Sequence, residues 1–512
     1  MAASWFSGQY VLSVVVLFLL LSSFPSSFDK VSCTEEDEML PRIGIIGAGL
    51  SGTSSAYFLR QLFGKKATID IFEAGKVGGR AAVININGLN YEAGASVIHK
   101  NNHYLVEFSQ AFRKNTVRLS HSPGMVGLYG TDDILFQTSD WLAITLAKLV
   151  WRYGTDFYNI QSWTKNHIFP KFDRIYKFQD QGLSFTTVED LLGAMGEDML
   201  NMTKHSIKDV LLDAGLSQRF VDEFGMAAMR NNYGQTTDVH GFVGAVSMAG
   251  VEPGLWSVEG GNQRIAENLL WGSKATLVEA KVSTVALIKD ELGTGSVSYE
   301  VEYEQSGKTN SREYDILILA MPLEGTKNEI NFVDFPVKVT PFSQPFHKIV
   351  TMFVQGRINK TTFGLNSADD FPPDLFTINR DTFFNSIGKQ SPVDSHQKPE
   401  KSPPSDYAVW KTFLNQVPSE EQVGKLFDKY EDLRFVDWMA YPEYKPNMDL
   451  PPFMLYDRLY YVNAIESAAA AMEMNVIGSK NVALLAFNQW QGNFDKIDEL
   501  HLPSVSNDKS DL

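Results

Sequence analysis

The chain has 512 residues, of which 44% are hydrophobic and 12% aromatic, so it can bury a large core in two or more lobes. Its formal net charge is −16 at pH 7. An acidic surface repels the phosphate backbone of nucleic acids, so we exclude nucleic-acid binding and expect a globular protein.

The N-terminus predicts a secretory signal peptide that ends near residue 27. The apolar core of the segment YVLSVVVLFLLLSSF covers about eleven to fifteen residues, which is short for a membrane span. No Lys or Arg precedes it, so an uncleaved anchor stays open. The single cysteine, Cys33, excludes both an intramolecular disulfide and a cysteine-based metal site.

The segment RIGIIGAGLSGTSSAYFLR, which begins at Arg42, is typical of a nucleotide-binding turn. Its short β-branched run predicts a buried strand that turns sharply into a helix. Gly47, Gly49 and Gly52 have the spacing G-x-G-x-x-G. The first glycine allows a tight turn, the second leaves room for a pyrophosphate, and the third lets the helix pack closely. The helix N-terminus then favours the charge of the pyrophosphate.

The next predicted strand, ATIDIFEA, ends on Glu73, 21 residues beyond Gly52. A carboxylate at this distance is placed to bond the ribose of an adenosine, and it repels a 2′-phosphate, which argues against NADP. The turn Gly78-Gly79-Arg80 adds backbone amides and a guanidinium beside the same pyrophosphate. Nicotinamide dehydrogenases do not usually carry this second turn, so we predict a flavin dinucleotide. A solvated acid and an ordinary glycine turn are the alternatives.

The sequence pattern changes twice along the rest of the chain, which shows no repeats. Residues 140–270 have mostly helical periodicity, and strands return in TLVEAKVSTVALI, SVSYEVEYE and YDILILAMP. Within the returning strands, Gly260-Gly261 precedes a helix and Val282 offers backbone atoms to an adenine edge. The segment 388–406 is rich in Pro, Ser and Lys, which predicts a flexible surface loop.

The order of these motifs resembles that of the flavin amine-oxidase superfamily. The segments IFEAGKVGGR, GASVIH, NMTKHS, LWSVEGGN and KNVALLAFNQW resemble, more narrowly, the prenylcysteine oxidases, also called prenylcysteine or farnesylcysteine lyases. The resemblance extends from about residue 42 to about residue 498. It implies an α/β fold with a Rossmann-like FAD-binding lobe and a mixed α+β substrate-binding lobe.

Cofactor signals at both ends and in the middle of the chain predict that the FAD lobe is discontinuous. We assign residues 40–100, 255–330 and 470–500 to this lobe. Residues 101–254 and 331–469 then build the prenyl-substrate lobe.

The resemblance implies FAD as cofactor and farnesylcysteine or geranylgeranylcysteine as substrate. Oxygen and water are consumed, and the products are free cysteine, a prenyl aldehyde and hydrogen peroxide, in the degradation of prenylated proteins. The prenyl C1–H bond is allylic and α to sulfur, so hydride loss leaves a stabilised cation that water captures. The flavin performs the hydride chemistry and the protein positions C1 in a dry channel, so neither a triad nor a metal site is required.

The resemblance also implies roles for particular residues. His99 follows the glycine turn YEAGAS, near where the superfamily holds the isoalloxazine, and Lys348 resembles the lysine that amine oxidases direct at flavin N5. A satisfied core histidine and a strand-edge lysine are the alternatives. Asn488 stands where many flavin oxidases have an acid that holds the ribityl chain, and whether it replaces that contact stays open. The predicted cofactor positions are Gly47, Gly49, Gly52, Glu73, Gly78, Gly79, Arg80, Gly260, Gly261, Val282 and Asn488.

The expected location is the secretory pathway. Two glycosylation sequons, at Asn201 and Asn359, fit this route, although such triplets also occur by chance. The family resemblance points to the lysosome or vacuole. Peripheral association with the plasma membrane stays open, because free prenylcysteines partition into lipid.

Two other functions stay open. The same flavin fold could oxidise an amine or polyamine, which an acidic pocket for a cation would favour. A non-enzymatic prenyl-binding escort similar to Rab-GDP dissociation inhibitors would share the glycine fold without redox chemistry. The signal segment counts against the escort, because prenylated GTPases are cytosolic.

Overall fold

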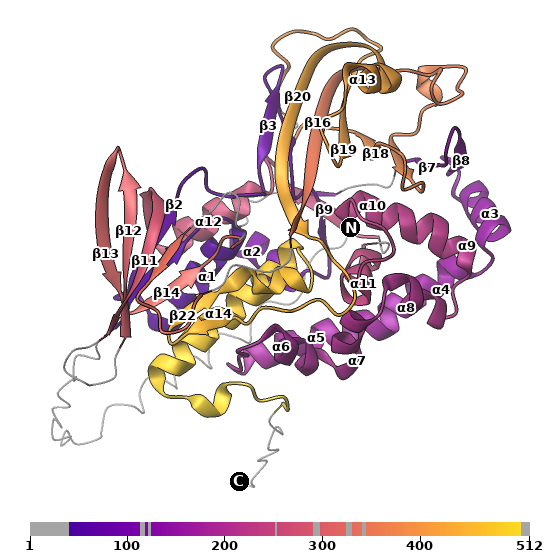
Figure 1. Ribbon diagram of the computed structural model, residues 1–512. Helices are drawn as coiled ribbons and strands as arrows, with labels where there is room; N and C mark the ends of the chain where they lie inside the picture. Colours follow the sequence, from indigo (N-terminus) through magenta and orange to yellow (C-terminus); the bar gives the residue numbers. More distant parts are fainter. Residues whose placement is uncertain are drawn as a thin grey trace, which may run out of the picture. The chain divides into compact units, whose positions relative to one another are not determined.

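The computed structural model describes most of the chain beyond the predicted signal segment (Figure 1). Residues 1–27 and Cys33 therefore lie outside the described residues. The described ranges are 40–112, 118–120, 124–250, 253–289, 297–323, 330–339, 345–394 and 396–502.

A six-stranded sheet carries the predicted glycine turn. In order across the sheet, its strands are β10 (Thr276–Glu279), β2 (Thr68–Glu73), β1 (Arg42–Ile46), β14 (Ile316–Leu319), β22 (Leu459–Tyr461) and β21 (Met454–Tyr456). The first five strands are parallel, and β21 pairs antiparallel with β22. All four residues of β14 are fully buried, as expected of a parallel strand covered on both faces.

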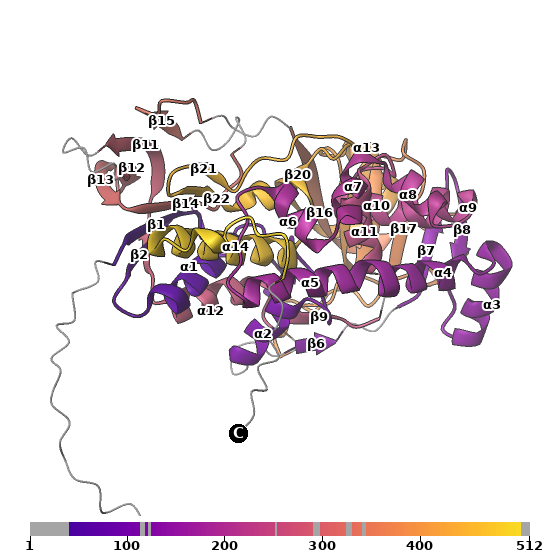
Figure 2. The same cartoon turned by 90° about the horizontal axis from the view of Figure 1, so that it is seen from below.

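Three helices pack together beside this sheet (Figure 2). They are α1 (Leu50–Phe63), α12 (Gln263–Ser273) and α14 (Met472–Gln491). Near the start of α1, the Ser479 hydroxyl donates to the Ser51 carbonyl at 2.9 Å. Near its end, the rings of Phe63 and Phe487 lie 5.2 Å apart. Helix α14 therefore runs along α1 in the same direction, and α2 (His103–Ala111) contacts both α12 and α14.

A four-stranded sheet packs against the parallel sheet through aromatic side chains. Tyr303 and Tyr314 lie 5.0 and 5.9 Å from the ring of Phe72. In order, the strands are β13 (Lys308–Tyr314), β12 (Val297–Gln305), β11 (Lys281–Lys289) and β15 (Asn331–Val333).

A seven-stranded sheet, separate from the first, contains the two longest strands of the described chain. These strands, β16 and β20, pair side by side along their length (Figure 1). In order, the sheet consists of β20 (Phe427–Pro442), β16 (Phe346–Ile358), β19 (Ala408–Leu414), β18 (Phe384–Lys389), β17 (Asp374–Thr377), β7 (Val126–Tyr129) and β8 (Ile134–Gln137). The short helix α13 (Glu420–Leu426) precedes β20.

The helical periodicity predicted for residues 140–270 is confirmed. Two π-helical turns, Thr164–Ile168 and Val221–Gly225, join neighbouring helices within this region. Besides α12, its α-helices are α3 (Leu142–Tyr153), α4 (Asp156–Trp163), α5 (Phe169–Asp180), α6 (Val188–Met195), α7 (Glu197–Asn201), α8 (Ile207–Asp213), α9 (Gln218–Phe220), α10 (Met226–Tyr233) and α11 (Gly241–Ala249).

Short strands complete the fold and anchor the segment that we predicted to be a flexible loop. A hairpin is formed by β3 (Val83–Ile86) and β4 (Leu89–Glu92), and a three-stranded sheet by β5 (Ile98–His99), β9 (Leu255–Val258) and β6 (Arg118–Ser120). The Val393 N–H donates to the Asn90 carbonyl at 2.8 Å, and the Asn87 side chain donates to the Lys401 carbonyl at 2.7 Å. The segment 388–406 lies on the surface, but these bonds hold its backbone against the hairpin.

The parallel sheet draws its strands from three separated stretches of the chain. Strands β21 and β22 fall within 331–469, which we had assigned wholly to the substrate lobe. The third FAD segment therefore begins near Met454 rather than at 470. The two predicted lobes are not separate domains, because the residues Leu40–Leu512 form one compact unit.

Candidate functional site

The glycine turn after β1 has the geometry that the sequence predicts. Gly47 has φ +106°, and its N–H donates to the Phe72 carbonyl at 2.8 Å. A Cβ on Gly52 would lie 1.9 Å from the Gly47 carbonyl oxygen, so only glycine lets α1 pack this closely on the turn. The tight turn and the close packing of α1 are both confirmed.

The second glycine turn lies directly beside the first. Gly49 and Gly78 form a β-bridge, and the Gly78 N–H donates to the Ala48 carbonyl at 2.9 Å. A Cβ on Gly49 would lie 4.0 Å from the nearest atom, Cα of Gly79, so its surroundings are open. The two turns together form a cradle at the N-terminus of α1, in which Gly49 is partly exposed and Gly79 exposed, and a pyrophosphate fits there. The N–H groups of Gly78 and Gly79 donate to the Ala48 and Lys76 carbonyls, so the second turn supplies close packing and space rather than the free amides that we predicted.

Glu73 ends β2 at the same edge of the sheet. Its carboxylate accepts hydrogen bonds from the N–H groups of Ala48 and Gly75, both at 2.7 Å. Each oxygen keeps a further lone pair, so the group can also accept from ribose hydroxyls. The Ala280 N–H donates to the Glu73 carbonyl, which brings the chain leading to buried Val282 close to this acid.

A buried carboxylate that the sequence analysis missed, Glu466, lies just beyond the end of β22. It belongs to the 3-10 helix η5 (Val462–Ser467), and its side chain is fully buried. The Arg80 guanidinium, which we predicted beside the pyrophosphate, instead donates to Glu466 and to the Ala440 carbonyl. Burial lowers the pKa of Arg80, but the charge of Glu466 outweighs it and holds the pKa above its ordinary value.

Two buried acceptors beside this pair have no hydrogen-bond partner among the described residues: Glu466 Oε2 and Asn463 Oδ1. The Asn463 side-chain amide donates to the other oxygen of Glu466 at 2.6 Å. A buried acceptor without a donor lowers the stability of the fold by about 1–3 kcal/mol. Such an atom therefore usually accepts a hydrogen bond from a bound ligand or water molecule. The carboxyl ends of parallel strands are where ligands of this fold bind. The two acceptors therefore fit the hydroxyl groups of a ligand held at this edge.

An aromatic cluster extends from Glu466 toward the helical region. The Tyr444 hydroxyl donates to the Glu466 backbone carbonyl at 2.9 Å. The ring of Tyr233 lies 5.1 Å from Tyr441 and 5.5 Å from Tyr444, and His240 lies 5.4 Å from Tyr444. Burial raises the pKa of Tyr441 to about 12 and lowers that of His240 to about 4. All four side chains are thus uncharged at neutral pH, which suits an apolar ligand.

Lys411, on β19, holds the glycine turn YEAGAS from the side of the large sheet. It is 6% exposed, and its Nζ donates to the Ser96 hydroxyl at 2.7 Å and to the Glu92 carbonyl at 3.2 Å. The Glu92 carboxylate accepts from the Asn262 N–H at 2.6 Å. Burial raises the pKa of Glu92 to about 7 and lowers that of Lys411 to about 8. Sequence reasoning did not single out either residue.

The two predicted catalytic side chains have ordinary structural surroundings. The His99 backbone N–H donates to the Asn102 side chain at 2.6 Å, and the ring Nδ1 accepts from the Asn101 N–H at 3.3 Å. The buried ring also stacks on Phe169, with the ring centroids 5.9 Å apart. These contacts favour the core-histidine interpretation. The Lys348 side chain is 46% exposed and forms an ion pair with Asp437 at 2.8 Å, which favours a strand-surface lysine.

Gly260 and Gly261 do not present their amides to a cofactor. The Gly260 N–H donates to the Val393 carbonyl at 2.6 Å, and the Gly261 N–H donates to the Val258 carbonyl at 2.9 Å. Their φ values of +83° and +104° are needed for the turn between β9 and α12. The pair therefore shapes the turn, and the structure does not favour its predicted contact with the cofactor.

The prediction of Asn488 as a ribityl contact is wrong. The segment VALLAFNQW lies in α14, and the Asn488 side chain donates to the Gly182 carbonyl and the Ser184 hydroxyl at 2.9 and 3.0 Å. Its neighbour Phe487 packs on Phe63, at the far end of α1 from the glycine turn. At 1.5 Å per residue that end is about 20 Å away. Glu466 stands at the sheet edge instead.

The two sequons differ in their surroundings. Asn201 is exposed at the C-terminal end of α7. Asn359 is half-buried, and its side-chain amide donates to the Gly424 carbonyl at 2.9 Å. Glycosylation stays a prediction at both positions, and Asn201 is the more accessible acceptor.

The sequence held a weak signal for Glu466 and none for Lys411. The run RLYYV has the apolar character of a buried strand, and polar Asn463 and Glu466 follow it, but no glycine marks the turn. In AVWKTFL, Lys411 shares one face of the predicted strand with the apolar Val409 and Phe413. Its burial depends on a partner 319 positions away, which no local pattern reveals.

Comparison with protein families and relatives gives matches over nearly the whole chain. A family model described as prenylcysteine lyase matches residues 136–499, and one described as an NAD(P)-binding Rossmann-like domain matches residues 45–112. Prenylcysteine oxidase 1 of Bos taurus is 42% identical over 465 residues, which cover 90% of each chain. The Homo sapiens protein of the same name is 40% identical over 500 residues, covering 96% of this chain and 97% of the relative.

Solved structures share the fold at low sequence identity. A putrescine oxidase variant aligns with a TM-score of 0.55 at 12% identity, covering 87% of this chain and 98% of that one. Cyclohexylamine oxidase from Brevibacterium oxydans aligns with a TM-score of 0.54 at 13% identity, covering 88% and 100%. These likenesses confirm the predicted α/β architecture with its Rossmann-like dinucleotide-binding domain.

Proposed function

The chain belongs to the prenylcysteine lyase family, and from this premise we propose that it is an FAD-dependent prenylcysteine oxidase. The observation that carries the proposal is the match to prenylcysteine oxidases along nearly the whole chain. The structural neighbours support an oxidase fold but, at their low identity, say nothing about the substrate.

The sheet edge offers partners for three parts of FAD. The glycine cradle and the N-terminus of α1 would hold the pyrophosphate, and Glu73 the adenosine ribose. Glu466 and Asn463, with their unpartnered buried oxygens, would accept from the hydroxyls of the ribityl chain. When bound, FAD supplies a two-electron acceptor that molecular oxygen can reoxidise.

The proposed reaction converts a thioether, oxygen and water to a thiol, an aldehyde and hydrogen peroxide. Carbon C1 of the prenyl group is oxidised by two electrons and takes the oxygen atom of water, the C1–S bond breaks, and sulfur leaves as the thiol. Oxygen accepts the two electrons and two protons. The chain itself needs only to orient C1 and limit access of water, so no strong base is required.

The residues around the sheet edge suit this positioning role. Buried Tyr233 and Tyr444 and half-buried Tyr441 place neutral aromatic side chains next to the sheet edge, against which an apolar chain can pack. The Arg80–Glu466 ion pair joins the glycine cradle to the end of β22. Lys411 joins the turn YEAGAS to the large sheet. Together these contacts would fix the two lobes around the reacting bond.

We also propose that the protein follows the secretory route to the lysosome or vacuole. The apolar segment near the N-terminus and the exposed Asn201 sequon support this route. Sequencing the N-terminus of the protein isolated from cells would locate the cleavage site near residue 27 or identify an uncleaved anchor. A shift in mobility after glycosidase treatment, lost in Asn201→Gln, would establish passage through the secretory pathway.

The activity is tested by incubating the purified full chain with farnesylcysteine and measuring peroxide, free thiol and aldehyde together. We expect the three products in equal amounts, from farnesylcysteine and geranylgeranylcysteine alike. A farnesylcysteine analogue saturated at the first double bond is the matched control, because it keeps the thioether but lacks allylic stabilisation.

The alternatives predict other outcomes in the same assay. Peroxide formed from spermine or putrescine but not from prenylcysteines would identify an amine oxidase. Binding of farnesylcysteine without any product, by a chain that purifies without flavin, would identify an escort. Either result would overturn the proposal.

A further inference from the structure

Helix α3, which the proposed function does not use, exposes a concentration of large apolar side chains. It lies at the outer edge of the helical region in both views (Figures 1 and 2). The exposed fractions are 74% for Trp141, 72% for Leu142, 48% for Ile144, 51% for Leu146, 64% for Val150 and 86% for Trp151. A cluster of this size on a protein surface normally marks a site of contact with another protein or a membrane.

The apolar surface covers much of the helix circumference rather than a narrow stripe. Only Leu149 and Tyr153 are buried, and they lie one turn apart on the same side. At 3.6 residues per turn, the apolar exposed side chains span roughly 200° around the axis. Lys148, the single charged side chain among residues 141–151, lies at one border of this arc.

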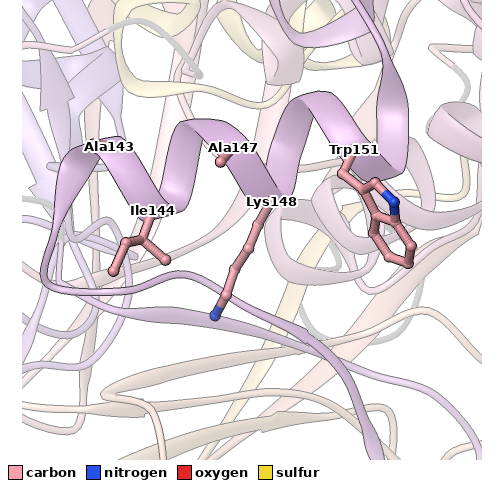
Figure 3. A pocket seen from close by; sticks show the side chains of 5 residues that line it. All are labelled: Ala143, Ile144, Ala147, Lys148 and Trp151. Carbon is pink, nitrogen blue, oxygen red and sulfur yellow. The ribbon is translucent and has the colours of Figure 1, made fainter.

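The outward side chains of α3 line a hollow on its surface (Figure 3). Ile144, Lys148 and Trp151 project from the same side of the helix. The Lys148 ammonium donates to the Gln137 carbonyl at the end of β8, at 2.9 Å. Its charge therefore lies beside β8, while the methylene groups of its side chain add apolar surface to the helix.

The distribution of these residues fits a lipid interface better than a protein groove. A helix bound in a groove buries one narrow stripe, whereas a helix lying in a bilayer interface buries its whole apolar face about 5–10 Å into the boundary between headgroups and acyl chains. An apolar arc of roughly 200° suits the interface better. Trp141 directly precedes the helix and Trp151 lies in its last turn, about 15 Å away along the axis, and tryptophan favours the headgroup level. At about 18 Å the helix is too short to cross a hydrocarbon core of about 30 Å.

The charge pattern selects the kind of lipid. The chain carries a formal net charge of −16, which an anionic membrane repels, and α3 itself has no acidic residue. Among the described residues there is no helix long and apolar enough to span a membrane. We propose that α3 docks this protein on the surface of a zwitterionic phospholipid bilayer. A lipid-partitioned substrate would thereby be concentrated near the enzyme.

The proposal is tested by sedimenting the full chain with phosphatidylcholine vesicles, which requires neither FAD nor substrate. In Val150→Asp/Trp151→Asp, two side chains exposed to solvent become charged, so the fold should be unaffected. We expect the vesicle partition coefficient to fall by about tenfold or more, because the buried apolar area is lost. Raising the salt concentration should leave binding by the wild type nearly unchanged, because few charges contribute.

Trp271→Asp is the matched control. Trp271 is 65% exposed on α12, where its ring stacks on the Lys274 ammonium at 3.9 Å. This variant should bind vesicles as the wild type does. All variants share the same N-terminus, cleaved or uncleaved, so any lipid affinity of that segment is common to them. A second measurement uses the wild type: lipids brominated in the acyl chain should quench its tryptophan fluorescence, and Trp141→Phe/Trp151→Phe should lose that quenching.

Three results would overturn the proposal. One is equal vesicle binding by the wild type and the α3 variant, and another is no binding by the wild type. The third is a wild-type dimer that the α3 substitutions dissociate, which would make a second copy the occupant. None of these results bears on the oxidase activity, which is measured separately with soluble substrate.

Discussion

The glycine cradle and the Glu466 cluster form two parts of the proposed FAD site, yet they are built in different ways. The cradle uses backbone from residues 47 to 80, and steric limits on a few glycines determine its shape. The cluster pairs Arg80 with a carboxylate 386 positions away, and only the folded sheet brings them together. Adding side-chain volume at a glycine should therefore disrupt the cradle, whereas removing one charged partner should disrupt the cluster.

The largest expected effect is that of Gly52→Ala. Its Cβ would lie 1.9 Å from the Gly47 carbonyl oxygen, which is backbone and cannot swing aside. We expect a loss of about 3 kcal/mol or more in the free energy of unfolding, and a chain that purifies without flavin. Chemical denaturation and the visible absorption spectrum measure the two effects.

Gly49→Ala is the matched control for this substitution, because its Cβ points into open surroundings. Its free energy of unfolding without flavin should stay within about 0.5 kcal/mol of the wild type, while flavin occupancy falls. Equal stability of the two alanine variants would show that the turn does not have the described geometry.

Glu466→Ala tests the second part of the site. It leaves the Arg80 guanidinium without its charge partner and the Asn463 amide without an acceptor. The Arg80 side chain is 30% exposed, so we expect a cost of about 2–3 kcal/mol rather than that of a fully buried charge. Flavin should bind more weakly as well.

Glu466→Gln keeps the shape of the side chain and one acceptor oxygen. Its loss of stability should be smaller than that of Glu466→Ala. If Glu466→Ala keeps full flavin occupancy at micromolar protein, Glu466 is not a cofactor contact, and the parallel between the two parts of the site fails.

The same contrast explains what the sequence could predict. Strand β1, the glycine turns and the helices of residues 140–270 follow from local sterics and periodicity, which a single segment contains. The sequence places Arg80 in the correct turn. Its partner, Glu466, follows strand β22 and lies 386 positions later in the chain, so no local pattern joins the two residues. Asn488 was misplaced because an apolar run without flanking glycines fits a buried helix as well as a strand.

A smaller effect is expected from Glu92→Gln, measured against pH. Burial raises the pKa of Glu92 from 4.5 to about 7, so the folded chain holds a proton that the unfolded chain releases between these values. This contribution is fully present below pH 4.5 and is lost as the pH rises through 7.

The wild type should therefore lose about 1–3 kcal/mol of stability between these pH values relative to Glu92→Gln. Measurements should stay below pH 7.5 because the pKa of Lys411 is lowered to about 8, and its titration above that value acts in the opposite direction. Identical pH slopes for the two chains would mean that Glu92 is not protonated in the folded state.

The smallest effect is expected for Lys348→Met, which we compare with Lys411→Met in the same seven-stranded sheet. Lys348→Met removes an ion pair with Asp437 in which both side chains are nearly half exposed, and such pairs contribute about 0–1 kcal/mol. Its kcat/KM for farnesylcysteine should stay within about twofold of the wild type. Lys411→Met should reduce both stability and flavin occupancy, because it removes the contact that fixes Ser96 against the sheet. A fall of about a hundredfold in kcat for Lys348→Met, with stability unchanged, would instead restore Lys348 as the flavin-directed lysine. The exposed ion pair would then have to open when flavin and substrate are bound, and the contrast between a surface lysine and a buried one would be lost.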